Sequence, residues 1–422
     1  MHRRLAVAAL IVTLFAGADW TQFRGADGTG ISQETGLPTT WTATENVVWK
    51  TPLPGFGSSS PITLGDKIFL TAYSGYGLDP DAPGVQGQLV LHTLCVDRTS
   101  GKILWDKAVT PKLPETDYDG ARVNLHGYAS ATPVTDGQSL YVFFGKTGVL
   151  KYDLDGNLLW QVSVGTEVDP HKWGSGASPI LFEDLLIVNA SAESQSIVAL
   201  NKTTGKEVWR AEGIVDSWAT PLIVTTAAGG KELVIVEKLQ ILGIDPATGE
   251  KLWNCSKSSD YICPSVIADG DVAYLINARF TAALFAVRTG GRGDVTDSHL
   301  LWTKKRWTTR VSTPIIHQGH LYGIDHLGQA HCLKLDDGET VYQERLDIDG
   351  DGDKIYASVV AADGKLYGVT RQGGTVVLAL SPKFELLAHN DLGDPSVFNA
   401  TPAVTDGQLL LRSDKFLYCI GK

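Results

Sequence analysis

Aromatic, imidazole and guanidinium side chains recur in the polar stretches that separate short apolar runs of this sequence. The residues of these types that could contact a ligand are His126, Tyr128, His171, Trp173, Trp218, Trp307 and Arg310. Histidine and tryptophan together suit planar or polar ligands, because indole offers an apolar face and imidazole offers hydrogen bonds. We expect His126, His171 and Arg310 to face a pocket framed by the three tryptophans. The alternative is that these side chains only fill the protein interior.

Basic residues in a second set of connecting stretches predict an anionic ligand. They are Lys146, Lys238, Arg279, Arg371 and Lys415. The whole chain is acidic, with a formal charge of -11, so a ring of cations would attract anions only locally. The competing interpretation is ordinary solvated loop charge, partly cancelled by Glu193, Glu237, Asp325 and Asp414. If the cations act together, Lys238 and Arg371 contact the ligand.

Four carboxylates alternate with other residues in one acidic stretch, at Asp347, Asp349, Asp351 and Asp353. Carboxylates at this spacing, with glycines that permit a sharp bend, suit the oxygen ligands of Ca²⁺. The twelfth position of the stretch is Ser358, where a helix-loop-helix calcium site has a bidentate glutamate. The sequence therefore predicts a loop site for calcium, or else a solvated acidic turn.

The five cysteines predict at most one disulfide. Cys95, Cys332 and Cys419 stand in apolar runs and are expected to pack as small buried groups. Cys255 and Cys263 flank one polar stretch and could be bridged in an oxidising compartment. The sequence contains no CxxC, HExxH, GxSxG or phosphate-binding glycine motif. Basic aromatic stretches typical of nucleic-acid binding are also absent, so we expect no nucleic-acid partner.

The first 18 residues have the order of an export signal. His2, Arg3 and Arg4 precede an apolar run from Leu5 to Phe15, and Ala16-Gly17-Ala18 follows as a cleavage site. The run is shorter than the roughly 20 residues of a membrane-spanning helix. We expect an exported protein, periplasmic or secreted, whose mature chain from residue 19 to 422 has no transmembrane span.

One phrase recurs eight times along the chain. The phrase begins with a small residue, which is followed by Ser or Thr and usually by Pro. Two apolar residues come next, and a turn containing Gly or Asp then leads to a second apolar run. The copies begin near Ser60, Thr132, Ser178, Thr220, Ser265, Thr313, Ser358 and Thr401. Two short apolar runs joined by such a turn are typical of a β-hairpin. Each copy therefore predicts one hairpin.

A second phrase follows each hairpin and ends in a large side chain. Its clearest copies run from Cys95 to Trp105, from Ala199 to Trp209 and from Gly243 to Trp253. Each contains a Thr-Gly or Ser-Gly turn and predicts another hairpin. Four strands repeating about every 45 residues are typical of a propeller blade.

The two ends of the chain complement each other. After the eighth phrase the sequence holds only three strands before Lys422, whereas residues 46–50 around Trp49 form a fourth-strand phrase with no strands before it. We expect this segment to complete the last blade beside residues 416–420, because an unpaired edge strand is avoided in a closed ring. The prediction is one all-β domain over residues 19–422, an eight-bladed propeller and a monomer. Seven blades and an open solenoid are the competing architectures.

The second phrase resembles the tryptophan-docking repeat of propellers of the pyrroloquinoline-quinone (PQQ) type, a family that includes quinoprotein alcohol dehydrogenases and the assembly factor BamB. The opening residues 19–25 also resemble exported bacterial members of this family. The resemblance implies the propeller fold. It implies two functions, because the family contains both dehydrogenases and binding scaffolds. Two features depart from these branches: no two cysteines are adjacent, as they are at the cofactor of the dehydrogenases, and no cysteine lies near the cleavage site for a lipid anchor.

Three functions remain open on this basis. The first is a binding or assembly scaffold that uses the loops between blades, with a protein or a small anionic or saccharide ligand as partner. The second is a PQQ- and Ca²⁺-dependent dehydrogenase, in which Asp216 takes a proton from an alcohol. The third is polysaccharide binding, because tryptophan and tyrosine stack on sugar rings. The sequence establishes neither cofactor.

Overall fold

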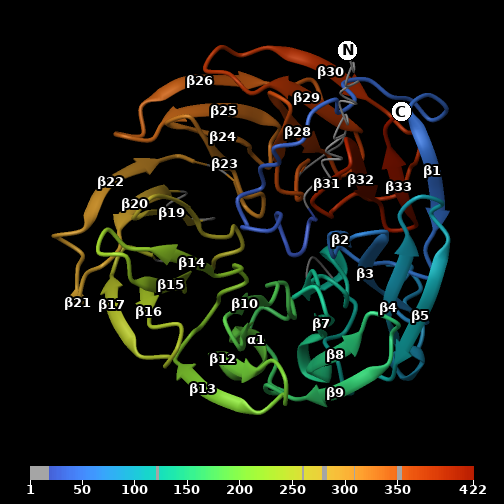
Figure 1. Ribbon diagram of the computed structural model, residues 1–422, viewed down its shortest axis with the longest axis horizontal. Helices are drawn as coiled ribbons and strands as arrows, with labels where there is room; N and C mark the ends of the chain where they lie inside the picture. The colour runs from blue at the N-terminus through green and yellow to red at the C-terminus, as the bar shows by residue number, and fades with distance from the viewer. Residues whose placement is uncertain (1–18, 120–122, 259–260, 278–282, 308, 349–353) are drawn as a thin grey trace, which may run out of the picture.

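The protein is a ring of eight β-sheets around a central axis (Figure 1). The computed structural model describes residues 19–119, 123–258, 261–277, 283–307, 309–348 and 354–422. The expected export signal, residues 1–18, lies outside this part. Each sheet has four antiparallel strands, in chain order in seven sheets and with β1 beside β33 in the eighth, and one sheet gains a fifth strand. This confirms the predicted all-β, eight-bladed propeller. No helix in the described residues is both long and apolar enough to span a membrane.

The first four blades follow one another along the chain. Blade 1 is β2 (Ile62–Leu64), β3 (Lys67–Ser74), β4 (Val90–Asp97) and β5 (Ile103–Val109). Blade 2 is β6 (Val134–Thr135), β7 (Ser139–Phe143), β8 (Val149–Asp153) and β9 (Leu158–Val162). Blade 3 is β10 (Ile180–Phe182), β11 (Leu185–Ala190), β12 (Ser196–Asn201) and β13 (Glu207–Glu212). Blade 4 is β14 (Leu222–Thr225), β15 (Lys231–Val236), β16 (Ile241–Ile244), β17 (Lys251–Cys255) and the added β21 (Gly293–Asp294).

The other four blades repeat the arrangement. Blade 5 is β18 (Ile267–Asp269), β19 (Val272–Asn277), β20 (Ala283–Arg288) and β22 (Leu300–Lys305). Blade 6 is β23 (Ile315–His317), β24 (His320–Ile324), β25 (Gln329–Lys334) and β26 (Thr340–Arg345). Blade 7 is β27 (Val360–Ala362), β28 (Lys365–Val369), β29 (Thr375–Ala379) and β30 (Leu386–Asn390). Blade 8 is β31 (Ala403–Thr405), β32 (Gln408–Arg412), β33 (Phe416–Ile420) and β1 (Val47–Pro52).

Helical structure in the described residues is confined to single turns in connecting segments. They are α1 (Ser191–Ser194) and the 3₁₀ turns η1 (Gln86–Gln88), η2 (Val123–Leu125) and η3 (Gly145–Thr147).

The ring closes through β1, as the complementary ends of the sequence predict. β1 pairs antiparallel with β33, and Trp49 stands opposite Cys419 while Thr51 stands opposite Leu417. The blue N-terminal strand and the red C-terminal strands lie together in Figure 1. The last sheet therefore contains residues from both ends of the chain.

In five of the eight blades, the tryptophan of the outer strand packs on the glycine turn of the next blade. Nε1 of Trp49 donates a hydrogen bond to the carbonyl of Arg98 at 2.9 Å, and its indole covers Gly101. A Cβ atom at Gly101 would lie 2.7 Å from that indole, and the residue has a φ of +70°, so both space and backbone require glycine. The same pairing recurs for Trp105 on Gly156, Trp160 on Gly205, Trp209 on Gly249 and Trp302 on Gly338.

Blade 4 departs from this pattern. Nε1 of Trp253 donates to the buried carboxylate of Glu232 at 2.7 Å, instead of to a turn carbonyl of the next blade. Glu232 also accepts hydrogen bonds from the amide of Gly290 and from Arg292. The segment 289–299 thus folds back on blade 4, where β21 pairs in parallel with β17.

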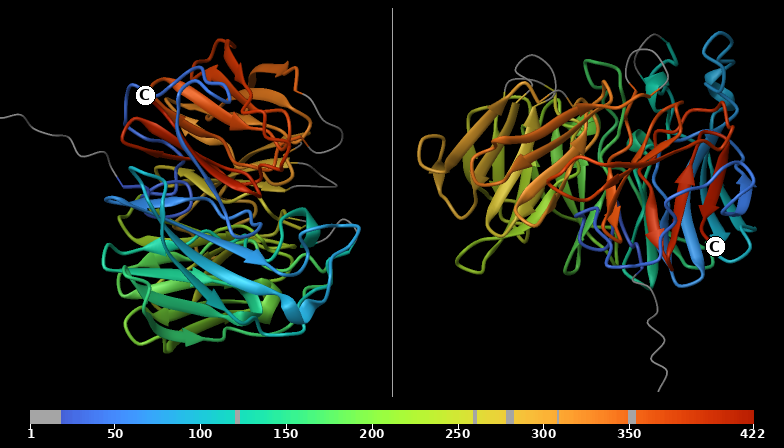
Figure 2. Two further views of the ribbon diagram at one scale, coloured as in Figure 1. Left: turned by 90° about the vertical axis from the view of Figure 1, so that its right-hand side faces the viewer. Right: turned by 90° about the horizontal axis from the view of Figure 1, so that it is seen from above.

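The segment 19–45 crosses one face of the ring before it enters blade 8 (Figures 1 and 2). The amide of Thr63 in blade 1 donates to the carbonyl of Trp20, and Ile31 forms a parallel bridge with Ala361 of blade 7. The amide of Trp41 donates to Oδ1 of Asn390 at 3.0 Å. This segment is therefore fixed to several blades of the ring.

Candidate functional site

Eight hydroxyl side chains form a closed ring of hydrogen bonds around the axis. They are Ser60, Thr132, Ser178, Thr220, Ser265, Thr313, Ser358 and Thr401, one at the start of each blade. In every case the backbone amide of one member donates to the hydroxyl oxygen of a member in a neighbouring blade, over 2.9 to 3.2 Å. The ring therefore links all eight blades without a break.

The hydroxyl ring lines an axial cavity of about 460 Å³. Each hydroxyl accepts an amide hydrogen, so its own O–H proton can be donated to a group in the cavity. The other lining residues come from the loops between blades, from blade 7 and from the N-terminal segment: Phe23, Ser58, Leu125, His126, Ser130, Trp173, Gly176, Trp218, Tyr261, Cys263, Arg310, Val311, Tyr356 and Arg371. All eight blades thus contribute to one site.

The N-terminal segment closes over the axis through Phe23 and Arg24. Phe23 lines the cavity, whereas Arg24 is buried beside it. The guanidinium of Arg24 donates to the carbonyls of Thr313 at 2.9 Å and Pro314 at 2.7 Å, next to the hydroxyl ring. Burial lowers the pKa of Arg24 to about 9. This buried arginine holds Phe23 in place against the cavity.

One wall of the cavity is aromatic. The ring centroid of Trp173 lies 4.8 Å from that of Trp218 and 4.6 Å from that of Tyr261. His171 packs on Trp173 at 5.0 Å, and its Nε2 lies 3.4 Å from a carboxylate oxygen of Asp216. The rings stand at angles of 54° and 88° to one another, so their contacts are tilted and edge-to-face. This wall is a packed cluster of aromatic side chains that line the cavity.

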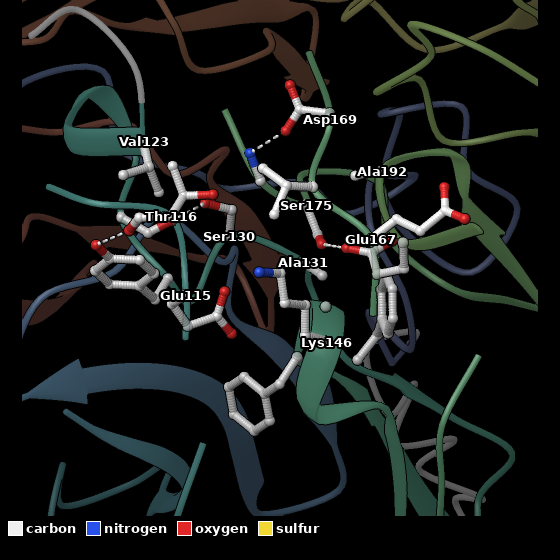
Figure 3. A pocket seen from close by; sticks show the side chains of 18 residues that line it. Glu115, Thr116, Val123, Ser130, Ala131, Lys146, Glu167, Asp169, Ser175 and Ala192 are labelled. Carbon is white, nitrogen blue, oxygen red and sulfur yellow. Dashed lines mark hydrogen bonds between the residues drawn. The ribbon is translucent and has the colours of Figure 1, made fainter. Parts of the chain in front are cut away.

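A buried carboxylate fixes the loop that carries Trp173. Asp169 accepts hydrogen bonds from the amides of Trp173 at 3.2 Å and Gly174 at 2.8 Å. Asp169 also lines a second cavity of about 30 Å³, between this loop and blade 2 (Figure 3). Nε1 of Trp218 donates to the carbonyl of Gly174 at 2.6 Å, which joins the two tryptophans through the backbone.

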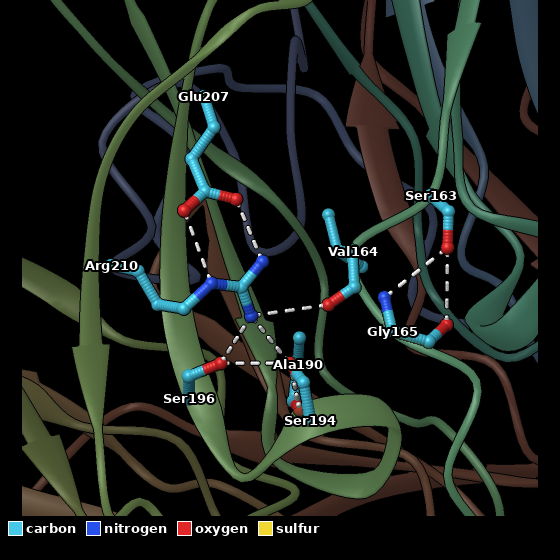
Figure 4. A network of polar contacts seen from close by, with 8 residues as sticks. All are labelled: Ser163, Val164, Gly165, Ala190, Ser194, Ser196, Glu207 and Arg210. Carbon is cyan, nitrogen blue, oxygen red and sulfur yellow. Dashed lines mark hydrogen bonds and ion pairs between the residues drawn. The ribbon is translucent and has the colours of Figure 1, made fainter.

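Arg210 on β13 holds the start of the same loop (Figure 4). Its guanidinium pairs with Glu207 at 2.7 Å and donates to the carbonyl of Val164 at 3.3 Å. It also donates to the hydroxyls of Ser194 and Ser196, on either side of the turn after α1. The outer strand of blade 3 thus connects the loop from blade 2 to the α1 turn.

The small cavity contains two carboxyl groups with raised pKa values. Burial raises the pKa of Glu193 to about 7, although a hydrogen bond from Ser175 favours its charged form. Burial likewise raises the pKa of Glu115 to about 7, against the attraction of Lys146. One oxygen of Glu193, Oε2, is buried and has no hydrogen-bond partner among the described residues. A cavity of this size has room for about one water molecule.

Two arginines give the other wall of the axial cavity a positive charge. Arg371, from the β28–β29 turn, donates to Oδ1 of Asn399 at 3.0 Å, and its guanidinium lies 4.4 Å from the ring centroid of Tyr356. Arg310 lines the cavity from the loop between blades 5 and 6. None of the described residues that line the cavity is an aspartate or glutamate. The described lining therefore carries positive charge from these two arginines, while the carboxyl of Asp414 outside the lining interacts electrostatically with Arg371.

His126 enters the cavity as a neutral ring at pH 7. It follows the η2 turn, and its Nδ1 lies 2.5 Å from Oγ of Ser130. Burial lowers the pKa of His126 to about 4. The imidazole can exchange hydrogen bonds with a ligand but adds no charge.

The structure brings together five of the nine predicted ligand residues in this cavity: His126, Trp173, Trp218, Arg310 and Arg371. His171 lies behind them in the aromatic cluster. Lys238 pairs with Asp216 at 2.6 Å and does not line the cavity. Arg279, another cation of the expected ring, lies outside the described residues.

Tyr128 and Trp307 pack elsewhere. Tyr128 lies among Tyr73, Tyr76 and Tyr118, with its hydroxyl donating to the carbonyl of Thr116 at 2.7 Å. Trp307 is buried against His331, with 4.7 Å between ring centroids. Both residues support neighbouring blades, as the packing interpretation of the loop aromatics expects.

The predicted calcium stretch falls largely outside the described residues. Only Asp347 of its four carboxylates is described, because Asp349, Asp351 and Asp353 lie in the segment 349–353. The described residues contain no group of three or more side chains arranged to hold a metal ion. The two cysteines of the predicted disulfide, Cys255 and Cys263, are not bridged in the structure, and Cys263 lines the axial cavity.

Phe23, Tyr356 and the hydroxyl ring are among the lining groups that the sequence did not assign to a site. The serine or threonine of each repeat was visible as part of a hairpin phrase. Its spacing gave no sign that the eight hydroxyls meet, since they lie about 45 residues apart. Nothing in the sequence around Phe23 indicated that it would line a cavity, apart from its place in the opening segment.

The described residues of the cavity do not fit PQQ with Ca²⁺. Calcium needs several oxygen ligands, usually including carboxylates, and none of the described lining residues supplies a carboxylate. Asp216, the candidate base, has a side chain only 6% exposed and is paired with Lys238 and His171. Asp216 is not among the described residues that line the axial cavity.

Comparison with known proteins identifies the family. A family model described as outer membrane protein assembly factor BamB matches residues 92–344, more than half of the chain. The chain belongs to this family of PQQ-like repeat propellers. BamB of Salmonella typhimurium is 22% identical over 307 residues, which is 59% of this chain and 76% of the relative. BamB of Escherichia coli is 27% identical over 158 residues, 37% of this chain and 35% of the relative.

Solved structures share the fold at low identity. BamB from Moraxella catarrhalis has a TM-score of 0.60 at 14% identity and covers 88% of this chain and 96% of its own. A quinohemoprotein alcohol dehydrogenase from Comamonas testosteroni has a TM-score of 0.64 at 11% identity, over 95% of this chain and 80% of its own. Such likenesses show the architecture and leave the function to the residues of the site.

Proposed function

We propose that this protein is an exported binding scaffold whose axial cavity takes an acidic segment of a partner protein. The observation that carries the proposal is the charge of the cavity, where Arg310 and Arg371 face a space whose described lining contains no carboxylate. An acidic side chain there gains charge-assisted hydrogen bonds from guanidinium groups and from the hydroxyl ring.

Membership of the BamB family supports a protein as the partner, because its characterised relatives carry the name of an assembly factor. The cavity of about 460 Å³ admits a few side chains of an extended segment. The aromatic wall of Trp173, Trp218 and Tyr261 offers apolar contact beside the arginines. An acidic segment that also contains an aromatic or aliphatic residue fits both walls.

The test measures binding of a fluorescein-labelled peptide of alternating glutamate and leucine to the purified full chain by fluorescence anisotropy. The double variant Arg310→Gln and Arg371→Gln removes two charges from the cavity. We expect it to weaken binding by at least about tenfold, since a hydrogen bond to a charged group contributes about 1.5–3 kcal/mol. The matched control is Lys305→Gln with Arg345→Gln, which removes two exposed charges from outer strands.

The expected result is strong weakening in the cavity variant and little change in the control. Equal weakening in both would show that only net charge attracts the peptide. Absence of binding to the unaltered protein would overturn the proposed function. Quenching of tryptophan fluorescence on binding supplies a second readout, because Trp173 and Trp218 line the cavity.

A further inference from the structure

Three polar side chains on blade 1 form a line of hydrogen bonds outside the axial cavity. Ser74 ends β3, His92 lies in β4 and Asp106 lies in β5. Oγ of Ser74 is 2.8 Å from Nε2 of His92, and Nδ1 of His92 is 2.9 Å from Oδ1 of Asp106. These are the distances that join a nucleophile, a base and the carboxylate that orients the base.

The sheet itself sets this arrangement. His92 stands opposite Ala72 on β3 and opposite Ala108 on β5. Ser74 and Asp106 are two residues from those positions, so both share a sheet face with His92 as its diagonal neighbours. Neighbouring strands therefore hold the three groups in line, without help from a mobile loop.

The carboxylate decides which nitrogen of His92 carries the proton. An ionised carboxylate can only accept hydrogen bonds, so Nδ1 must be protonated where it faces Asp106. Nε2 of the neutral ring then has a lone electron pair and accepts the hydrogen of the Ser74 hydroxyl. This polarity lets His92 take a proton from Ser74.

Ser74 is partly exposed, and the backbone packs against one side of it. The amide of Phe56 donates to the carbonyl of Tyr73 at 2.9 Å, which places Gly55 against Ser74. Gly75 follows with a φ of +79°, so the chain turns away directly after the serine. The amides of Gly75 and Tyr76 have no backbone acceptor among the described residues. Amides that directly follow a nucleophile are suitable donors to an oxyanion.

We propose that Ser74, His92 and Asp106 form a nucleophilic triad that hydrolyses small, uncharged carboxylic esters. Only a small substrate could reach Ser74, because Gly55 lies against Ser74, His92 is only 8% exposed, and neither cavity described above is lined by the triad. An uncharged substrate fits because Asp106 would repel an anionic acyl group.

The reaction has two balanced steps. Oγ of Ser74 attacks the ester carbonyl carbon while its proton passes to Nε2 of His92. The bond from that carbon to the alcohol oxygen breaks, and the alcohol leaves with the proton, so an acyl-serine remains. Water then attacks the acyl carbon and gives its proton to Nε2, after which the carboxylic acid departs and Ser74 regains its hydrogen. Asp106 acts as a positioning residue throughout, because it holds the protonated Nδ1.

A fluorophosphonate probe tests the nucleophile, and release of nitrophenol from p-nitrophenyl acetate tests turnover. We expect mass spectrometry to locate the probe on Ser74 and Ser74→Ala to abolish both signals. His92→Gln keeps a hydrogen-bonding side chain but removes the base, so labelling should slow by at least about 100-fold. Asp106→Asn should slow labelling by at least about tenfold. Exposed Ser163, mutated to alanine, is the matched control and should change neither rate.

The proposal is overturned if the folded full chain takes up no probe, or if His92→Gln labels as fast as the unaltered protein. Circular dichroism and the unfolding midpoint of each variant show whether the fold is retained. The axial variant Arg310→Gln with Arg371→Gln should retain full labelling of Ser74. The triad and the proposed scaffold function therefore succeed or fail independently.

Discussion

The amide of Thr401 donates a hydrogen bond to the hydroxyl oxygen of Ser60 at 3.1 Å, although 341 residues separate them in the chain. This bond closes the hydroxyl ring at the point where blade 8 meets blade 1. The β1–β33 pairing completes blade 8 at the outer rim, where Trp49 lies beside Cys419. The propeller is thus closed at two radii, one near the axis and one at the circumference.

Removal of one hydroxyl from the ring should destabilise the whole propeller. Thr220→Val keeps the side-chain volume but removes the oxygen that accepts the buried amide of Ser178 at 3.0 Å. We expect a loss of about 1–3 kcal/mol in the free energy of unfolding, the cost of an unsatisfied buried donor. Urea unfolding measures it. Thr220→Ser keeps the hydroxyl, so its free energy of unfolding should be closer to that of the unaltered protein. A larger loss in Thr220→Ser than in Thr220→Val would contradict the role of the ring.

Substitution of Gly101 should weaken the junction between blades 8 and 1. In Gly101→Ala the new Cβ would lie 2.6 Å from Oγ1 of Thr51 and 2.7 Å from the indole of Trp49. Gly65→Ala is the matched control, because Gly65 also has a positive φ but its new Cβ would have no atom within 4 Å. Both variants incur about 1–2 kcal/mol of backbone strain. We expect Gly101→Ala to lose about 1–3 kcal/mol more, from overpacking, as measured by urea unfolding. Equal losses would argue against tight docking of Trp49.

Arg24 should control whether the N-terminal segment stays on the axis. Arg24→Met removes the hydrogen bonds to the carbonyls of Thr313 and Pro314. The loss of even one hydrogen bond to a charged group costs about 1.5–3 kcal/mol, so amides in residues 19–32 should exchange with deuterium at least about tenfold faster. Hydrogen-exchange mass spectrometry measures this. Arg345→Met, on an exposed outer position, should leave the exchange unchanged.

The buried Glu193 should make the protein more stable at mildly acidic pH. Its pKa is raised from 4.5 to about 7, so the folded state binds more protons than the unfolded state between these values. The free energy of unfolding contributed by this group therefore falls as pH rises through that window. Glu193→Gln should show a smaller loss of stability between pH 5 and pH 8 than the unaltered protein, as measured by urea unfolding at each pH.

The difference between the two unfolding curves isolates Glu193 from other groups. His126 acts in the opposite direction, because its lowered pKa of about 4 makes stability rise with pH up to its ordinary value of 6.5. Exposed Glu344, changed to glutamine, is the control and should leave the pH dependence unaltered. A Glu193→Gln curve parallel to that of the unaltered protein would contradict a raised pKa.

The architecture could be predicted because the same local physics recurs in every repeat. A glycine that turns sharply and a tryptophan that ends the following strand must appear at fixed spacing, so Gly101 and Trp105, or Gly249 and Trp253, mark blades in the sequence alone. Complementary partial repeats at the two ends then predicted closure through Trp49. The turns and strands depend on residues close in sequence, and the docking of each tryptophan depends on the next copy of the same repeat.

Side-chain direction in the loops depended on packing that the sequence does not reveal. Trp173 and Trp218 line the axial cavity, whereas Tyr128 packs among other tyrosines beside the small cavity and Trp307 is buried against His331. Residue type gives the chemistry of a loop side chain, but only its contacts decide which way it faces.

By itself, the sequence determined the number of blades, their strand order and the way the ring closes, because these follow from a repeated pattern of turns and apolar strands. Only the tertiary structure decided which groups meet. The eight hydroxyls around the axis and the line from Ser74 through His92 to Asp106 join residues from separate strands. Their meeting depends on strand register and blade curvature, which are set by the closed ring as a whole.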